Sequence, residues 1–502
     1  MAMMRARKGA VMGGWRFGVA TGIFMSAVFG VSAFAQWSTD PAMPLAVADR
    51  SGPQVQPKIV GIAGGGFYIS WFDSSTGGYD VYLQRLDVEG NEMWAHNGVL
   101  VADRGFSSTQ DYGLSVDTLG NALLAFRDDR GATTEVTVSK IGLDGTLLWG
   151  ADGVQVSSGG FFVAAPRVTG TSDGNVVVAW TSDVNVMVQK LDPAGADLWG
   201  SGLTLSPAAG SFTAADIHAA DSGTAILSFT HMIGGFPSPI QLWTQKLASA
   251  NGAFLWGSGH VPVYDQAGGS LQIGNFPPFV PDGSGGAVFT WYTSTPSLQC
   301  RVQRILANGS EAFAHQGVEV STNAAQIRVS PRAAFNPTTQ EIFVAWREQN
   351  GNQSQSALYA QKLDASGVRQ WTDNGSQLMP MTADEITDVT TLVYDDGALV
   401  SWIHSPSFGN DPVYAVRVDG SGSLAWIPPI AELCILPTQS SRLVGVMGSE
   451  GFAAYAWSDG DSSVGDIFAA NLNGDGSLGY SGSVFGDGFE SGDTTEWSRT
   501  EP

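Results

Sequence analysis

The chain has 502 residues, and its 47 acidic side chains outnumber its 24 basic ones to give a formal net charge of −23. This excess of negative charge repels phosphate backbones and anionic lipid, so neither nucleic acid nor a membrane surface is expected as a partner. Charged residues make up only 14% of the chain, whereas 64 glycines and 16 tryptophans are present, a composition that favours β-structure with many turns and aromatic packing.

The first 35 residues have the pattern of a secretory signal peptide. Four basic residues precede an uncharged, apolar stretch at 17–35, which ends on the A-x-A pattern of Ala33 and Ala35. A membrane anchor is the alternative, but the stretch is short for a span and contains three glycines. We therefore expect 1–35 to be removed and the mature chain, with a net charge of −27 and no membrane span, to be exported to the periplasm, the cell surface or the medium.

An apolar run that ends in an aromatic residue recurs eight times, at intervals of 49 to 62 residues. Examples are "GGFYISW", "GNVVVAW" and "GGAVFTW". The aromatic positions are Trp71, Phe126, Trp180, Phe229, Trp291, Trp346, Trp402 and Trp457. We interpret these side chains as structural residues that pack between neighbouring repeats, rather than as platforms for a ligand.

Each repeat continues with an alternating segment, an x-G turn and a second aromatic residue, as in "YLQRLDVEGNEMW" at 82–94 and "YAQKLDASGVRQW" at 359–371. Alternation at period two predicts a strand with one buried face, and the x-G dipeptide is typical of a hairpin. A short strand such as "NGVLV" follows, and another opens each repeat, which gives four strands. Eight such repeats predict an all-β fold, an eight-bladed β-propeller of four-stranded antiparallel blades.

The last repeat, from about 433 to 480, has no outer strand of its own. The missing strand is found at the other end of the mature chain, because "WSTDPAMPLAVADRSG" at 37–52 matches "WAHNGVLVADRG" at 94–105. We therefore expect the N-terminal strand of the mature chain to complete the eighth blade and close the ring. This assigns 36–480 to the propeller and leaves 481–502 as an acidic C-terminal tail.

The tail and the repeat each resemble known groups. The stretch "VFGDGFESGDTTEWSRTEP" at 484–502 resembles the D-G-F-E-S-G-[DN]-x-x-x-W segment that ends many exported proteins of proteobacteria, and implies an envelope or secretion tag in a Gram-negative bacterium. A flexible acidic terminus is the alternative. The unit W-x-D followed by Y-x-Q-[KR]-L-D-x-x-G-x-x-x-W resembles that of uncharacterised exported bacterial propellers over 37–480, which implies architecture only.

Part of the same unit, L-D-x-x-G-x-x-x-W, is similar to the tryptophan-docking motif of eight-bladed quinoprotein dehydrogenases, which bind pyrroloquinoline quinone and calcium in the channel. Those enzymes commonly carry a vicinal disulfide over the quinone, whereas Cys300 and Cys434 are far apart here. We expect both to be free, buried thiols, and we do not predict pyrroloquinoline quinone or any other cofactor.

Motifs for metal binding or catalysis are few. The loop "SDGDSSVGD" at 458–466 is a candidate calcium site through Asp459, Asp461 and Asp466. The six histidines have no zinc spacing, and neither a nucleophile elbow nor a P-loop occurs. No catalytic residue is therefore predicted.

The clearest insertions lie in the fourth and longest repeat. They place Phe236, Tyr264, Phe276 and Phe279 in loops with proline and glycine, a composition suited to stacking on sugars or gripping a peptide. Alternatively, they cover a blade edge.

We predict a monomeric binding or envelope scaffold that recognises a glycan or a protein through its loops. The alternative is an enzyme, either polysaccharide-active or quinoprotein-like, which an acid-lined channel would favour; a channel plugged with apolar side chains would favour the scaffold.

Overall fold

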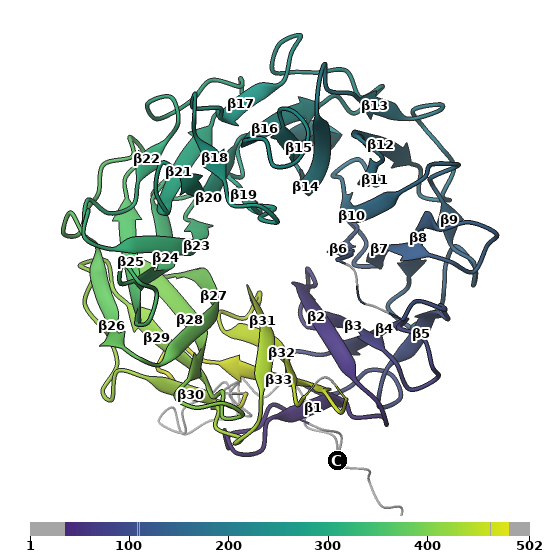
Figure 1. Ribbon diagram of the computed structural model, residues 1–502. Helices are drawn as coiled ribbons and strands as arrows, with labels where there is room; N and C mark the ends of the chain where they lie inside the picture. Colours follow the sequence, from purple (N-terminus) through teal and green to yellow (C-terminus); the bar gives the residue numbers. More distant parts are fainter. Residues whose placement is uncertain (1–35, 108, 110, 462, 481–502) are drawn as a thin grey trace, which may run out of the picture. The chain divides into compact units, whose positions relative to one another are not determined.

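The computed structural model describes residues 36–107, 109, 111–461 and 463–480. The predicted signal peptide and acidic tail lie outside these residues. The described chain forms eight antiparallel sheets arranged as blades around a central axis (Figure 1). The prediction of an all-β, eight-bladed propeller is confirmed. Across the described ranges, no helix is long and apolar enough to cross a membrane.

Blades are numbered along the chain, and each is given from the inner strand to the outer one. Blade one contains β2 (Gln54–Gly61), β3 (Phe67–Asp73), β4 (Asp80–Leu86) and β5 (Val99–Ala102). Blade two contains β6 (Gly113–Val116), β7 (Ala122–Asp128), β8 (Glu135–Ile141) and β9 (Val154–Gln155). Blade three contains β10 (Val163–Gly170), β11 (Val176–Ser182), β12 (Asn185–Leu191) and β13 (Leu203–Leu205). Blade four contains β14 (Ser211–Ala219), the 3-10 turn η1 (Asp221–Gly223), β15 (Ala225–Met232), β16 (Ile240–Leu247) and β17 (Val261–Tyr264).

The second half of the ring repeats this order. Blade five contains β18 (Ser270–Leu271), β19 (Phe279–Pro281), β20 (Ala287–Thr295), β21 (Gln299–Ile305) and β22 (Val318–Glu319). Blade six contains β23 (Ile327–Phe335), β24 (Ile342–Gln349), β25 (Ser356–Leu363) and β26 (Ser376–Thr382). Blade seven contains β27 (Glu385–Tyr394), β28 (Gly397–Ser405), β29 (Val413–Val418) and β30 (Ala431–Cys434). Blade eight contains β31 (Ser440–Met447), β32 (Ala453–Asp459), β33 (Asp466–Leu472) and β1 (Leu45–Ala48).

Blade eight is assembled from both ends of the described chain, as the sequence predicts. Strand β1 pairs antiparallel with β33, with Leu45 opposite Ala469 and Ala46 opposite Phe468 (Figure 1). Because β1 covers the outer edge of β33, the edge that would otherwise present unpaired backbone groups is closed.

Eight hydrophobic clusters hold the blades together, and each contains buried side chains from two neighbouring blades. The eight repeated aromatic residues lie in these clusters, on the second strand of each blade, and none is more than 3% exposed. Trp71, for example, packs with Ala454 and Ala456 of blade eight. Their side chains are therefore committed to packing between blades. Cys300 and Cys434, on blades five and seven, are free and buried, as expected.

The second aromatic residue of the repeat connects each blade to the next by a hydrogen bond. Its indole N–H donates to a backbone carbonyl in the turn between the third and fourth strands of the following blade, at 2.9 to 3.3 Å. The pairs are Trp37 to Val88, Trp94 to Leu143, Trp149 to Pro193, Trp199 to Ser249, Trp256 to Ala307, Trp371 to Gly420 and Trp426 to Gly474.

The glycine of each x-G turn allows this contact. At Gly90 the backbone has φ of 85°, and a Cβ atom there would lie 2.6 Å from the backbone nitrogen of Trp37. Only glycine satisfies both conditions. At the remaining junction Phe313 packs on Gly367 in the same way but has no N–H to donate.

The polar residues of the repeat also form hydrogen bonds and ion pairs within their own blade. The buried glutamine of Y-x-Q donates to a backbone carbonyl in the loop after the second aromatic residue, at 2.6 to 3.1 Å, in Gln84, Gln189, Gln245, Gln303 and Gln361. The basic residue that follows pairs with an acid between the first two strands: Lys140 with Asp117, Lys190 with Asp173, Lys246 with Asp221, Arg304 with Asp282 and Lys362 with Glu341. The repeated motif thus builds the blade, and function must lie in residues outside it.

Trp37 tests the closure of the ring. We expect Trp37→Ala to lower the free energy of unfolding by about 3 kcal/mol or more, because it removes packing against Phe67 and Phe452 together with the hydrogen bond to Val88. Trp37→Phe, which removes chiefly the donor, should cost about 1 kcal/mol. Denaturant unfolding measures both.

The control is Met43→Ala, since Met43 lies on the same segment and is 70% exposed. Its unfolding should match that of the wild type within about 0.5 kcal/mol. Unchanged unfolding of Trp37→Ala would contradict a closing role for the N-terminal segment.

Candidate functional site at the channel and its mouth

Five inner strands carry a bulge at the same place, where one residue adopts a left-handed conformation. These residues are Gln56, Ala165, Ser330, Asp388 and Arg442, with φ between 47° and 60°, and the strand register shifts beside each. Such a conformation is costly for a residue with a side chain. Because the left-handed conformation recurs in five blades, the bulge is a regular feature of this fold. The bulge turns residues of the inner strand toward the channel axis.

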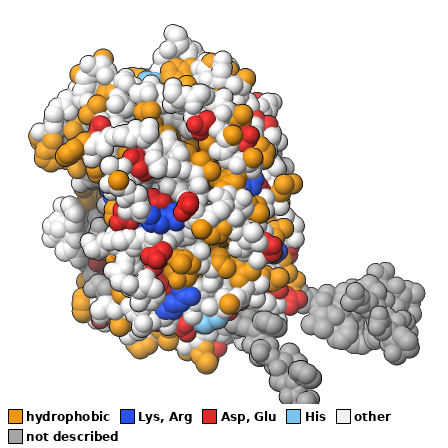
Figure 2. Space-filling view, turned by 90° about the vertical axis from the view of Figure 1, so that its right-hand side faces the viewer, with side chains coloured by type: hydrophobic (Ala, Val, Ile, Leu, Met, Phe, Trp, Pro, Cys, Tyr) orange, Lys and Arg blue, Asp and Glu red, His pale blue; other side chains and the backbone are white. Residues whose placement is uncertain are grey.

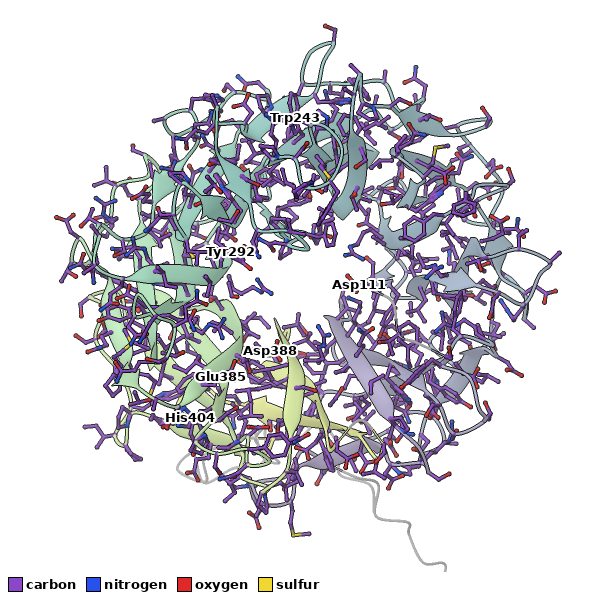
Figure 3. All side chains as sticks on the ribbon, viewed as in Figure 1. Asp111, Trp243, Tyr292, Glu385, Asp388 and His404 are labelled. Carbon is purple, nitrogen blue, oxygen red and sulfur yellow. The ribbon has the colours of Figure 1, made fainter. Side chains whose placement is uncertain are left out.

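Charged side chains from these bulges line the channel. Lys58 of blade one and Arg167 of blade three both contact the carboxylate of Asp111, at 2.9 and 2.5 Å. Burial alone would raise the pKa of Asp111, but the two cations outweigh it and hold that pKa well below its usual value. The two cations and one carboxylate bridge three blades at the channel wall (Figure 3).

A second pair lies on blade four. His218 Nε2 lies 3.0 Å from Asp216 Oδ2, and the ring of Phe279 meets the imidazole edge-on at 4.8 Å. Burial lowers the pKa of His218, but the Asp216 carboxylate outweighs this effect, so that the net shift is upward. The Asp216 carboxylate is fixed further by the backbone N–H of Phe279, at 3.3 Å.

Two arginines on the opposite wall have no such partner. Asp388 accepts the backbone N–H of Arg442 at 2.6 Å, and within the described residues neither the Arg442 nor the Arg332 guanidinium lies within 4 Å of a carboxylate. A channel cavity of about 330 Å³ is lined by Lys58, Arg332, Asp388 and Leu443, among others. The channel wall therefore carries both acidic and basic side chains, and it is not plugged with apolar ones.

A cavity of about 780 Å³ lies at one mouth of the channel, over blades one, seven and eight. Its walls come from inner-strand starts and from the loops that join second and third strands. The side chains are mostly hydroxyl, amide or charged groups: Gln56, Tyr79, Thr109, Glu385, Ser405, Ser407, Phe408, Asp411, Gln439, Ser440, Ser441, Arg442, Ser458 and Asp461.

Three residues give the mouth its chemistry. Phe408 is 97% exposed on the β28–β29 loop and presents an aromatic face at the edge of a polar cavity. Glu385 contacts Arg347 at 3.5 Å and is otherwise accessible. Arg442 lines the same cavity, and no carboxylate of the described residues lies within 4 Å of its guanidinium. Figure 3 places Glu385 on blade seven and Asp388 at the channel wall.

The four aromatic residues proposed for ligand binding separate into two groups. Phe236 and Phe276 are 76% and 41% exposed. Tyr264 and Phe279 are 0% and 3% exposed, which corrects the prediction that they lie in loops. Tyr264 ends β17 and packs against Trp291, while Phe279 belongs to β19 of blade five and packs against Phe289. Each extends the apolar face of a strand, and the core between blades four and five covers it.

The candidate calcium loop connects β32 and β33. Asp459 accepts the Ser440 hydroxyl at 2.9 Å, and Asp461 accepts the backbone N–H and the hydroxyl of Ser463. Asp466 stands opposite Asp459 across the hairpin. Over the residues that the structure describes, no three His, Cys, Asp or Glu side chains form a group able to hold a metal. Calcium at these carboxylates stays a prediction.

Sequence reasoning missed the channel cations. A signal was present, because x-P-[KR] recurs at 56–58, 165–167 and 330–332, where each inner strand begins. The proline follows the left-handed residue, and the basic residue comes next. This pattern places Lys58, Arg167 and Arg332 at equivalent positions around the axis. The mouth has no comparable motif, since its lining is drawn from unrelated loops of three blades.

One side of the outer surface carries side chains of mixed type. Figure 2 shows the side of the molecule that lies at the right of Figure 1, where acidic, basic and apolar side chains are interspersed among neutral ones. This rim therefore presents no field of one sign, and the cations of the channel are the clearest local departure from the negative net charge.

No protein-family model and no curated protein matches the chain. Several solved propeller structures are similar to it in fold. The subtype N10 neuraminidase-like protein of A/little yellow-shouldered bat/Guatemala is 11% identical, with a TM-score of 0.39 over 72% of this chain and 94% of that one. Prolyl oligopeptidase B from Galerina marginata is 11% identical, with a TM-score of 0.44 over 82% and 56%. A polysaccharide lyase is 9% identical, with a TM-score of 0.41 over 87% and 92%. Likeness at this level of identity concerns the fold alone.

Asp466 provides a test of the carboxylates in the closing blade. Burial, together with the nearby Asp49 and Asp459, raises the pKa of Asp466 to about 6. The pKa in the unfolded chain is about 3.9, so folding favours the protonated carboxyl. Its contribution to stability is present below pH 4 and is lost as the pH rises through 6.

We expect Asp466→Asn to stabilise the protein at pH 7.5 by about 1 kcal/mol, less than the full shift implies because the side chain is partly exposed. At pH 4 the melting temperature should change little. Asp461→Asn, at an exposed carboxylate, is the control and should bring no gain at pH 7.5.

The Asp466→Asn variant also tests the predicted calcium site. Calcium bound at Asp466 should raise the melting temperature of the wild type at pH 7.5 but not that of Asp466→Asn; equal rises would rule out this site.

Proposed function

We propose that the protein is an exported binding protein that takes a glycan at the mouth of its channel. The observation that carries the proposal is the cavity of about 780 Å³ with a lining of hydroxyl, amide and charged side chains, beside the exposed ring of Phe408. Ligand sites in proteins are concave and fix their ligand through a few placed polar groups. The signal peptide predicted at 1–35 supports export.

The chemistry of the lining suits a sugar. A sugar ring has an apolar face that stacks on an aromatic side chain and a rim of hydroxyl groups that both donate and accept hydrogen bonds. Ser405, Ser407, Ser441 and Gln439 offer hydroxyl and amide partners at the mouth, and Phe408 offers the stacking face. A cavity of this size has room for several sugar units along its length. Phe236 and Phe276, exposed on blades four and five, are candidates for secondary contacts on loops.

Phe408→Ala tests the proposal. We expect it to weaken oligosaccharide binding by about tenfold, since stacking on an exposed ring contributes about 1 kcal/mol or more. Its melting temperature should match that of the wild type, because the side chain has almost no packing partners. A glycan array identifies the ligand, and isothermal titration calorimetry measures the affinity.

The matched control is Phe161→Ala. Phe161 is fully exposed on the linker between blades two and three and does not line the cavity. Its affinity for the oligosaccharide should stay within twofold of the wild type. Equal losses from both variants, or binding unaffected by Phe408→Ala, would contradict recognition at the mouth.

A further inference from the structure

Blade five is the one described blade whose inner strand is interrupted. Residues 272–278 separate β18 from β19, and this insertion leaves a small cavity of about 160 Å³ between blades five and six. Its lining consists of Ile273, Gly274, Asn275, Pro277, Pro278, Thr290, Trp291, Tyr292, Ser330, Pro331 and Arg332. A break in an otherwise regular repeat has thus produced a pocket with its own set of side chains.

Polar groups in this cavity are not used by the protein itself. The Arg332 guanidinium donates only to the carbonyl of Pro331, at 3.0 Å. Neither the Tyr292 hydroxyl nor the Asn275 amide side chain has a hydrogen-bond partner within the described residues. The Arg332 side chain is exposed, and Tyr292 and Asn275 are partly exposed, so all three can reach a molecule in the cavity. Each keeps N–H or O–H donors that a bound ligand can accept.

The charge of Arg332 is uncompensated, in contrast to its two equivalents. Lys58 and Arg167 occupy the same position after the bulge in blades one and three, and both form an ion pair with the one carboxylate of Asp111. Arg332 has no described carboxylate within 4 Å, although Asp388 and Tyr292 are near enough to influence it. The free cation therefore lies beside the interrupted strand, where Tyr292 reaches the channel wall (Figure 3).

Arg332 also connects the cavities. It lines both this pocket and the channel cavity of about 330 Å³. The channel cavity in turn includes Leu443, the neighbour of the mouth residue Arg442. The channel cavity therefore lies next to the mouth cavity in sequence, through Arg442 and Leu443, and shares Arg332 with the small pocket. The small pocket is suited to one sugar unit.

We propose that the cavity between blades five and six is a carboxylate subsite, in which Arg332 binds the carboxylate of an acidic sugar and Tyr292 and Asn275 bind its hydroxyl groups. This inference rests on the proposed function and narrows the ligand class to glycans that contain uronic acid units. A guanidinium matches a carboxylate with two parallel hydrogen bonds, which makes it selective for that group over a neutral hydroxymethyl.

The test measures binding of tetrasaccharides from polygalacturonate, alginate and hyaluronate to the full chain, each beside its carboxyl-reduced counterpart. Reduction removes the charge and keeps the ring and linkage. We expect at least one acidic oligomer to bind at least tenfold more tightly than its reduced form. Arg332→Gln should abolish that ratio, and Tyr292→Phe should weaken the acidic oligomer severalfold.

Arg127→Gln is the control for a lost positive charge, because Arg127 lies over Phe106 and Phe162 on the other side of the ring. It should leave the ratio unchanged. Melting temperatures of all three variants confirm folding, and Tyr292→Phe keeps the test informative if Arg332→Gln fails to fold.

The two proposals fail in different ways. If neutral and acidic oligomers bind equally and Phe408→Ala weakens both, glycan binding at the mouth stands and the carboxylate subsite is wrong. If no oligosaccharide binds, the proposed function fails, and saturation-transfer NMR with free D-glucuronate and D-glucose then decides the subsite. A glucuronate signal that Arg332→Gln removes would support it, and equal signals from the two sugars, or none from either, would overturn it.

Discussion

The aromatic residue that each blade places on the next blade's turn, with an indole N–H donated to that turn at seven of the eight junctions, is the contact on which the ring depends. It positions the outer hairpin of one blade over the face of its neighbour, and the apolar clusters between blades form beneath it. Other residues of the repeat are needed for the same contact. Glycine in the turn leaves room for the indole, and a buried glutamine fixes the loop that holds the tryptophan. Most of the repeated sequence therefore serves one geometric purpose.

This explains why the fold could be predicted and the site could not. Trp37 could be matched to Trp94 by sequence, because both satisfy the same contact, so the closing strand was foreseeable from residues 37–52 alone. A propeller repeats its structural residues and varies its functional ones. Tyr264 and Phe279 were predicted to lie in loops because proline and glycine around an aromatic residue indicate a loop, whereas both lie in strands that pack in the core.

The charged residues of the channel show a second reason why the candidate site could not be predicted from the sequence. Lys58, Arg167 and Arg332 share a sequence pattern, yet only Arg332 has no carboxylate within 4 Å among the residues that the structure describes. The difference depends on Asp111, which comes from blade two and lies beside Lys58 and Arg167 across the curvature of the ring. No local pattern encodes which cation a distant carboxylate will neutralise. Ion pairs formed between blades in the folded protein decide which of the channel cations are available to a ligand.

Blade eight has a consequence for how the protein forms. Its hairpin and its outermost strand come from opposite ends of the described chain, so pairing of Leu45 with Ala469 closes a loop that contains the other seven blades. The entropy of closing such a loop is recovered only when the whole chain is present. A chain that lacks its last repeat therefore cannot complete this fold. The ring can close only after both ends of the propeller are present, and until β1 pairs with it the edge of β33 is open to association with other chains.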